Sequence, residues 1–139
     1  ILCHAVLEWL ADPFALTATM RSLLKPNGWL SLAFYNKDAL IFQNLIKGNL
    51  RKLKKQKFAG EAGGLTPQQP IDAQLLTEQL NTQGWNIHSR SGIRVFHDYM
   101  RSEMRQKITD DELIQTELSY RHHPTLGPLG RYQHWLCQR

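Results

Sequence analysis

Apolar positions near the start of the chain fall into two compact runs separated by a helical stripe. The runs cover residues 1–9 and 29–35, and each has the length and apolar content of a buried strand. Between them, residues 13–24 carry apolar side chains about every 3.6 positions, behind a proline that suits the first turn of a helix. Residues 24–28 contain Pro and Gly and favour a tight turn. Strand, helix, turn and strand predict a parallel βαβ unit.

The first apolar run has no strand or helix start signal before it. We therefore expect it to be the exposed carboxyl end of a buried parallel strand that begins upstream of residue 1. The carboxyl ends of the first two strands, near residues 7–9 and 35–37, are expected at one edge of the sheet, where open α/β sheets bind ligands. The chain is then expected to be the C-terminal half of an α/β domain and to carry half of a site.

The rest of the chain predicts further helices and strands joined by loops. After residue 92, apolar and basic positions alternate before a polar helical stretch. The expected elements are a helix over 39–57 weakened at Gly48, a Gly- and Pro-rich loop over 58–70, a helix over 71–83 ending at Gly84, a strand over 85–91, a helix over 110–120 and a strand over 130–137.

Positive charge is unevenly distributed along the 139 residues, which carry a formal net charge of +5. One short stretch without an acidic residue holds six cations, which we call the basic segment: Lys47, Arg51, Lys52, Lys54, Lys55 and Lys57. Such a run favours an anionic partner such as the phosphates of a nucleic acid. An ordinary solvated helix end, stabilised by cations near its C-terminus, would carry the same charges.

The sequence also predicts what the protein lacks. No apolar run approaches the ~20 residues that span a bilayer, and no signal peptide precedes the first strand, so we expect a soluble, cytoplasmic protein without a membrane partner. Cys3 and Cys137 are far apart and fit two buried thiols in a reducing compartment. The adjacent His122 and His123 are too few to bind a metal, and we predict no metal site.

Several short motifs resemble the Rossmann-like methyltransferases that use S-adenosylmethionine. The turn over 24–28 is similar to the Leu-Lys-Pro-Gly-Gly turn of that superfamily, with Asn27 in place of its first glycine. Four further blocks resemble the bacterial tRNA 5-carboxymethoxyuridine methyltransferases: HAVLEW at 4–9, LAFYN at 32–36, RVFHDY at 94–99 and LGRY at 129–132.

The resemblance implies the fold and the domain organisation. It implies an α/β fold in which residues 1–139 are the C-terminal half of a seven-stranded Rossmann-like methyltransferase sheet, mostly parallel with an antiparallel final strand and with helices on both faces. The N-terminal, cofactor-binding half is expected to be absent from this chain and necessary for a complete site. Residues 37–70 are expected to form a helix-and-loop insertion that binds tRNA.

The resemblance also implies an activity. Its members methyl-esterify the carboxylate of 5-carboxymethoxyuridine at the wobble position of tRNA, with S-adenosylmethionine as cofactor, and this chain alone is expected to be inactive. Methyl transfer depends on holding the nucleophile and the methyl carbon in line. Because a carboxylate is already ionised at neutral pH, no general base is needed. The site instead needs cationic or hydrogen-bonding groups that orient the carboxylate.

Three residues at the end of the first strand are candidates for the cofactor rim. The resemblance implies that His4 touches S-adenosylmethionine, whereas the simpler interpretation is a polar residue that ends a strand and bonds to backbone. Glu8 and Trp9 follow on the same rim. Trp9 is expected either to contact the adenine or substrate or to pack against the next helix.

Candidates for the acceptor site come from three separate blocks. Tyr35 and Arg94 are the predicted catalytic residues, because a phenol and a guanidinium fork both donate hydrogen bonds to a carboxylate. Alternatively, Tyr35 is a core residue whose hydroxyl contacts water, and Arg94 lies on an edge strand and faces solvent. The predicted substrate-binding residues are Asn36, His97, Tyr99, Arg131 and Tyr132.

Phosphate contacts give affinity without reading base sequence, so the basic segment and Arg121 are the predicted tRNA-binding residues. Two other functions remain open from the sequence. One is a methyltransferase of the same fold that acts on a small molecule, because fold does not determine substrate. The other is a nucleic-acid-binding module without catalytic activity.

Overall fold

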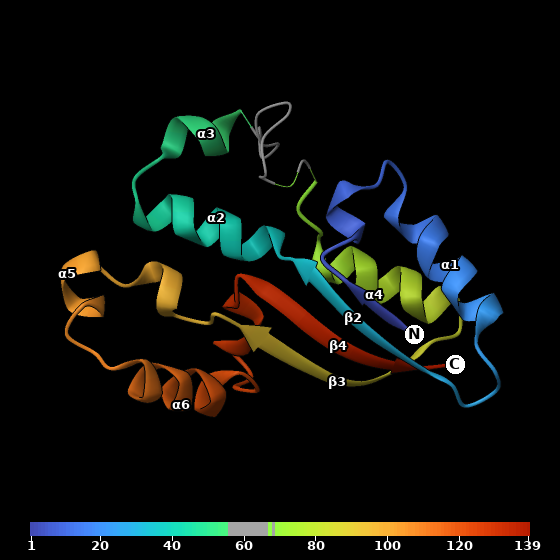
Figure 1. Cartoon of the computed structure of the whole chain (residues 1–139). Helices are drawn as coiled ribbons and strands as arrows, with labels where there is room; N and C mark the ends of the chain where they lie inside the picture. The colour runs from blue at the N-terminus through green and yellow to red at the C-terminus, as the bar shows by residue number, and fades with distance from the viewer. Residues whose placement is uncertain (56–66, 68) are drawn as a thin grey trace.

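The structure, a computed structural model, describes residues 1–55, 67 and 69–139 (Figure 1). In this part of the chain four strands form one sheet: β1 (Leu2–His4), β2 (Trp29–Tyr35), β3 (Asn86–Ile93) and β4 (Tyr132–Gln138). Their spatial order is β1-β2-β4-β3. β1 and β2 are parallel, and β4 runs antiparallel to both of its neighbours. The α/β class and the antiparallel final strand are therefore confirmed.

Helices of very different length connect these strands. The α-helices are α1 (Pro13–Leu23), α2 (Lys37–Ile46), α3 (Leu50–Lys54), α4 (Ala73–Thr82), α5 (Ser102–Arg105) and α6 (Asp110–Tyr120), and the 3-10 helices are η1 (Leu7–Trp9), η2 (His97–Tyr99) and η3 (Gly127–Leu129). In Figure 1, α1 and α4 lie beside one part of the sheet, whereas α2, α3, α5 and α6 gather near its other end. The described helices include none that is long and apolar enough to cross a membrane.

The first apolar run is shorter as a strand than the sequence predicts. β1 ends at His4, because Ala5 adopts a left-handed backbone conformation with φ 53° that turns the chain. Leu7–Trp9 then form η1 instead of continuing the strand. The prediction of a strand through residue 9 is wrong, since apolar content alone does not distinguish a buried strand from a buried 3-10 turn.

Most other predicted boundaries agree with the structure, for local reasons. The Asp12 carboxylate accepts the N–H groups of Phe14 and Ala15 and so starts α1. Gly48, with φ 68°, separates α2 from α3 as predicted. The predicted strand over 85–91 extends to Ile93, so the basic and apolar alternation that follows Gly92 belongs largely to the turn after β3.

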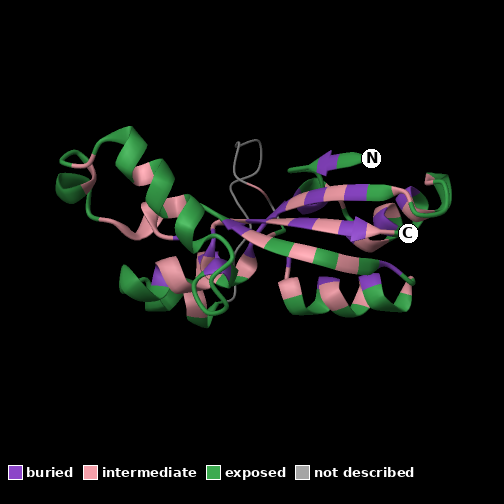
Figure 2. Cartoon of the chain, turned by 90° about the horizontal axis from the view of Figure 1, so that it is seen from below, coloured by how far each residue is buried: buried purple, intermediate pink, exposed green. Residues whose placement is uncertain are grey.

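The hydrophobic core lies on one face of the sheet. Leu30, Leu32 and Phe34 of β2 are fully buried there together with Trp135 of β4, and the Phe34 and Trp135 rings meet edge to face 4.9 Å apart. α1 and α4 cover this core, with Met20 from α1 and Leu76 and Leu80 from α4 (Figure 2), and β1, η1 and the segments flanking α4 add further residues. The alternate residues of the same strands point to the other face and are partly buried or exposed, except for Tyr35, which is buried. The core thus fixes β2 and β4, and with them the carboxyl end of β2.

Candidate functional site

Three predicted site residues converge on one buried carboxylate at this end of the sheet. Arg94 forms an ion pair with Oδ1 of Asp98, and Nδ1 of His97 lies 3.1 Å from the same oxygen. Nη1 of Arg131 lies 3.4 Å from Oδ2 of Asp98. The Asp98 side chain is 6% exposed, whereas those of Arg94 and Arg131 are 45% and 32% exposed. The Asp98 cluster, as we name these four residues, therefore buries its negative charge and presents its positive charge outward.

Glu117 of α6 holds the backbone of the segment that carries Arg94, His97 and Asp98. The Glu117 carboxylate accepts the N–H groups of Val95, Phe96 and His97 at 2.6, 3.1 and 2.9 Å. Successive N–H groups that point inward form a cradle for an anion, and here a side chain fills it. Arg94, just before this cradle, has φ 57°, a conformation that costs a non-glycine residue about 1 kcal/mol. The three hydrogen bonds help to hold Arg94 in this strained conformation.

Two tyrosines flank the cluster. Tyr35 of β2 pairs with Tyr132 of β4, and their rings lie 5.6 Å apart. The guanidinium carbon of Arg131 sits 5.4 Å from the centre of the Tyr35 ring, within cation–π range. Burial raises the pKa of the Tyr35 phenol against the opposing effect of Arg131. Tyr35 therefore stays protonated at neutral pH and keeps its O–H as a hydrogen-bond donor.

Two further predicted residues hold the neighbouring elements together. Asn36 is fully buried, and its amide donates to the carbonyls of Pro128 and Gly130 at 2.7 and 2.9 Å. The Tyr99 hydroxyl donates to the carbonyl of Leu129 at 2.7 Å, and burial raises its pKa to about 12. Asn36 thus ties η3 to the end of β2, and Tyr99 ties it to η2, next to Asp98. In this structure Asn36 and Tyr99 are positioned to support the site.

A cavity of about 330 Å³ adjoins the exposed side of the cluster. Arg94 and His97 line one side of it, and apolar side chains of β3 and α6 line the other, namely Ile93, Leu113, Ile114 and Leu118, next to Glu117. Volumes of this order are typical of sites for small organic groups. A flat apolar group that carries an anionic substituent would fit such a mixed lining.

The three predicted rim residues lie apart from the cluster, at the end of β1. Nε2 of His4 lies 2.8 Å from the Ser31 hydroxyl, which lies 2.7 Å from Nε2 of His134. Trp9 is 48% exposed. Glu8 is fully buried, and among the described residues neither of its carboxylate oxygens has a hydrogen-bond partner.

The state of the Glu8 carboxyl follows from this burial. Burial raises its pKa, and the backbone N–H groups of Glu8 and Tyr35 oppose that rise without reaching hydrogen-bond geometry with its oxygens. A buried carboxyl group without a partner is costly to a fold and marks a position that a ligand or another segment can satisfy. Glu8 is therefore the one predicted rim residue whose carboxylate is buried without a hydrogen-bond partner among the described residues.

The basic segment is arranged quite differently. Its members Lys47, Arg51, Lys52, Lys54 and Lys55 are all exposed, in and around the short helix α3. None of these five forms an ion pair with a carboxylate of the described residues. Lys57 and most of the predicted loop over 58–70 lie outside the described residues.

Nothing in the described part of the chain indicates a metal site or a reactive thiol. No three His, Cys, Asp or Glu side chains gather there in a way that could hold a metal ion. Cys3 and Cys137 are both free and buried, as the sequence predicts. Burial raises the pKa of the Cys137 thiol to about 11, so it is not a nucleophile at neutral pH.

Sequence reasoning missed the two acidic residues that organise the site. Asp98 stands inside the RVFHDY block, yet no role was predicted for it. Asp98 lies four positions after Arg94, a spacing at which oppositely charged side chains often form an ion pair. The sequence therefore contained a signal for this contact. Glu117 lies about twenty residues from its backbone partners and gave no local signal.

Comparison with known proteins gives two curated relatives that match nearly the whole chain. The tRNA 5-carboxymethoxyuridine methyltransferase of Escherichia coli strain K12 is 38% identical over 134 residues, which are 96% of this chain, and the protein of that name from Escherichia coli O157:H7 matches equally. The chain is homologous to the C-terminal half of this methyltransferase. It spans about half the length of these relatives, 51% of each. The resemblance inferred from the four sequence blocks is thus confirmed.

The other comparisons concern families and folds. No protein-family model matches the chain. The structure of PKMT2 from Rickettsia typhi superimposes with a TM-score of 0.52 over 99% of this chain and 34% of that chain, at 12% identity. At this identity the likeness shows the fold alone.

The methyltransferase homology and the local geometry coincide in the Asp98 cluster. Two of the four blocks on which the resemblance depends, RVFHDY and LGRY, supply all four of its residues. A third block, LAFYN, supplies Tyr35. Blocks that are well separated in the sequence therefore meet at one place in space.

Proposed function

We propose that this chain is the acceptor-side half of an S-adenosylmethionine-dependent tRNA methyltransferase. In this proposal the complete protein esterifies the carboxylate of 5-carboxymethoxyuridine at the wobble position of tRNA. An N-terminal half would complete both the seven-stranded sheet and the cofactor site. The observation that carries the proposal is the convergence of Arg94 and Arg131 on Asp98 beside Tyr35, in a chain homologous to that methyltransferase.

The charges of the cluster suit an anionic acceptor. Two guanidinium groups against one carboxylate leave one positive charge in excess, and the carboxylate is the buried partner. Glu117, the other nearby acid, already accepts three backbone N–H groups. An incoming carboxylate therefore meets the exposed N–H groups of Arg94, which match its two oxygens.

Orientation is the main task of these residues. The acceptor carboxylate is ionised at neutral pH, so Arg94 and Tyr35 need only donate hydrogen bonds and fix the direction of its reacting oxygen. In this proposal His97 and Tyr132 flank the base, while Arg131 holds Asp98 and the Tyr35 ring in place. Asn36 and Tyr99 fix η3 beneath them.

The rim at the end of β1 is assigned to the cofactor. S-adenosylmethionine, when bound, supplies an electrophilic methyl group on a sulfonium. Glu8 fits it as an unpartnered acceptor, and Trp9 offers an exposed aromatic face. His4, linked to Ser31, would border the same edge. The basic segment, with Lys57, and Arg121 are assigned to tRNA phosphates, which need exposed and unneutralised cations.

Product analysis tests this function directly. The chain, alone and joined to the N-terminal half of the Escherichia coli relative, is incubated with S-adenosylmethionine and tRNA that bears 5-carboxymethoxyuridine. Digested nucleosides are then followed by mass spectrometry. We expect the methyl ester with the joined protein and its loss in Arg94→Ala and Tyr35→Phe, while Lys25→Ala at the far end of the sheet retains it.

Each outcome has a definite meaning. The ester from wild type and Lys25→Ala, but from neither site variant, supports both the reaction and the acceptor site. No ester from a joined protein that binds S-adenosylmethionine contradicts the proposed substrate. Equal ester formation by all variants would remove Arg94 and Tyr35 from the acceptor site.

A further inference from the structure

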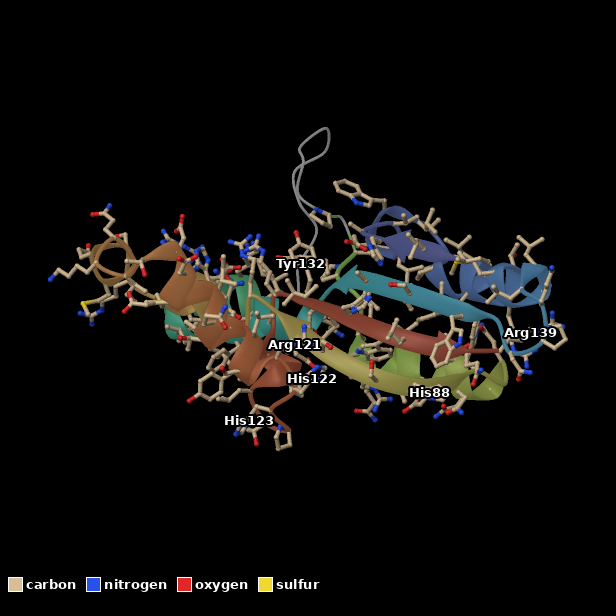
Figure 3. All side chains as sticks on the ribbon, turned by 60° about the horizontal axis from the view of Figure 1, so that its bottom comes forward. His88, Arg121, His122, His123, Tyr132 and Arg139 are labelled. Atoms are coloured by element: carbon tan, nitrogen blue, oxygen red, sulfur yellow. The ribbon has the colours of Figure 1, made fainter. Side chains whose placement is uncertain are left out.

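A second cationic cavity lies on the core face of the sheet, away from the Asp98 cluster. It has a volume of about 380 Å³ and is enclosed by β3, α4 and the connection between α6 and β4. Arg90, Arg121, His122 and His123 line it together with the polar Thr77 and Gln74. Figure 3 shows Arg121, His122 and His123 side by side at the turn after α6. Four nitrogen-bearing side chains from two distant segments thus border one space.

Arg90 is held in place at the wall of this cavity. Its guanidinium carbon lies 4.8 Å from the centre of the buried Trp135 ring, and its Nη2 donates to the Thr77 hydroxyl at 3.2 Å. Stacking on an aromatic face keeps a guanidinium plane fixed while leaving its other N–H groups available. Among the described residues, no carboxylate lies within ion-pair distance of Arg90 or Arg121. Asp38 also lines the cavity, so permanent cations outnumber acids two to one.

The hydrogen bonds of the two histidines indicate which ring nitrogen carries the proton in each. Nδ1 of His123 accepts the backbone N–H groups of Thr125 and Leu126, both at 3.2 Å. The neutral ring therefore carries its proton on Nε2, which is free to donate. Nδ1 of His122 lies 3.0 Å from the carbonyl of Arg90, which can only accept, so that Nδ1 carries a proton. His122 thus also ties the α6–β4 connection to the strand that bears Arg90.

We infer that this cavity binds a backbone phosphate of the RNA, together with its adjoining ribose, at a place separate from both the Asp98 cluster and the basic segment. The fixed Arg90 guanidinium, the Arg121 guanidinium and the His123 donor can bind phosphate oxygens without reading base sequence. Trp135 is 2% exposed and stacked by Arg90, so the cavity offers no open aromatic face to a base. The volume exceeds that of a phosphate alone and leaves room for a sugar and for its hydroxyl groups near Thr77 and Gln74.

The inference rests on the proposed function for the identity of the RNA as tRNA, but its test does not depend on methyl transfer. Binding of tRNA by the 139-residue chain is measured by fluorescence anisotropy across a salt series. Arg90→Gln removes one cation that binds phosphate and is expected to lower the affinity roughly fivefold at about 0.15 M salt and to reduce the slope of log K against log salt by about one. Lys25→Gln, with the same charge change in the turn before β2, is the matched control and should leave both unchanged.

A second variant keeps the test valid if Arg90→Gln disturbs the fold. Arg90→Lys retains the charge without the planar fork and is expected to keep the salt slope while weakening the binding. Thermal unfolding of each variant verifies that it is folded. A salt slope in Arg90→Gln equal to that of Lys25→Gln would overturn the phosphate site, as would an Arg90→Lys slope reduced as far as that of Arg90→Gln.

The two proposals fail in different ways. An absent ester with the expected reduction of the salt slope in Arg90→Gln would contradict the proposed reaction and leave the phosphate site standing. A normal ester with an unchanged salt slope would contradict the phosphate site and leave the proposed reaction standing.

Discussion

The Asp98 cluster and the basic segment both gather positive charge, yet they hold it in opposite ways. In the cluster, each guanidinium group is fixed by a buried carboxylate, and the backbone beneath is fixed by Glu117. In the basic segment, five exposed cations surround a helix of five residues and form no ion pair with a described carboxylate. The first arrangement holds cations in fixed directions, as the proposed acceptor site requires, and the second gathers charge without fixing it, as the proposed phosphate contacts require.

The largest expected effect follows from removing the charge that fixes the cluster. Asp98→Asn keeps the side-chain shape but releases Arg94 and Arg131, so the acceptor loses its orientation. We expect single-turnover ester formation by the joined protein to fall about 100-fold, because small misplacements of reacting groups cost about that much. The exposed Asp111→Asn on α6 is the matched control. Equal rates in the two variants would show that the cluster does not set the geometry.

Removing Glu117 tests whether the cluster depends on its backbone support. Glu117→Ala leaves the N–H groups of Val95, Phe96 and His97 without their acceptor, next to a strained Arg94. We expect the free energy of unfolding to drop by about 2 kcal/mol in urea titrations of the chain, since hydrogen bonds to a charged group are among the stronger ones.

Two substitutions make the result interpretable. Glu117→Gln keeps one side-chain acceptor and should recover part of the stability, whereas the exposed Glu103→Ala should change little. If Glu117→Ala unfolds at the same urea concentration as Glu103→Ala, the support comes from elsewhere in the fold.

The contrast between the two regions also explains what the sequence could predict. Helices and strands whose signals are local, such as α1 with its Asp12 cap and α6 with the Thr109 and Glu112 capping box, were predicted close to their observed bounds. The break at Gly48 was likewise local. β1 was predicted too long, because the turn at Ala5 depends on a positive φ that apolar periodicity does not reveal.

The candidate site likewise has features that neighbouring residues reveal and features that depend on residues distant in the sequence. Charge runs are visible in a sequence, so the basic segment was easy to find. The contacts that connect the RVFHDY block to distant residues were not, since Arg131, just before β4, pairs with Asp98 across 33 positions and Glu117 on α6 lies about twenty residues from the N–H groups it accepts. Residue types were therefore predictable for the cluster, whereas the acids that position them required the tertiary structure.

The ion pair between Asp72 and Lys37 is intermediate between the ion pairs of the buried Asp98 carboxylate and the exposed cations of the basic segment. Their ion pair is 3.0 Å long, and each side chain is slightly more than one-third exposed. The Asp72 carboxylate also caps α4, accepting the N–H groups of Gln74 and Leu75. The Leu75 N–H is the main cause that lowers the pKa of Asp72, and Lys37 adds to it against partial burial. Asp72→Ala should cost about 1 kcal/mol, as is typical when a helix cap is removed.

The direction of the pKa shift fixes the pH dependence of that cost. A pKa lowered by folding stabilises the folded chain above the pKa of the unfolded carboxyl, and this stabilisation disappears as pH falls through the folded pKa. The gap between wild type and Asp72→Ala in urea titrations should therefore be constant near neutrality and shrink below about pH 4. Lys37→Ala should have a smaller effect, since partly exposed ion pairs contribute little. A gap that widened on acidification would contradict this assignment.

The smallest effect on the fold is expected in the basic segment. Reversing the charges of Lys52 and Lys55 touches no buried contact, so unfolding in urea should be unchanged. Binding of tRNA should weaken, with the slope of log K against log salt falling by about one for each phosphate that is no longer bound. Ester formation at saturating tRNA should stay constant, because these cations give affinity and not orientation. A matched reversal of Lys25 and Lys107 supplies the background effect of net charge, and a drop in the saturated rate beyond that background would mean that the basic segment, like the Asp98 cluster, positions the acceptor.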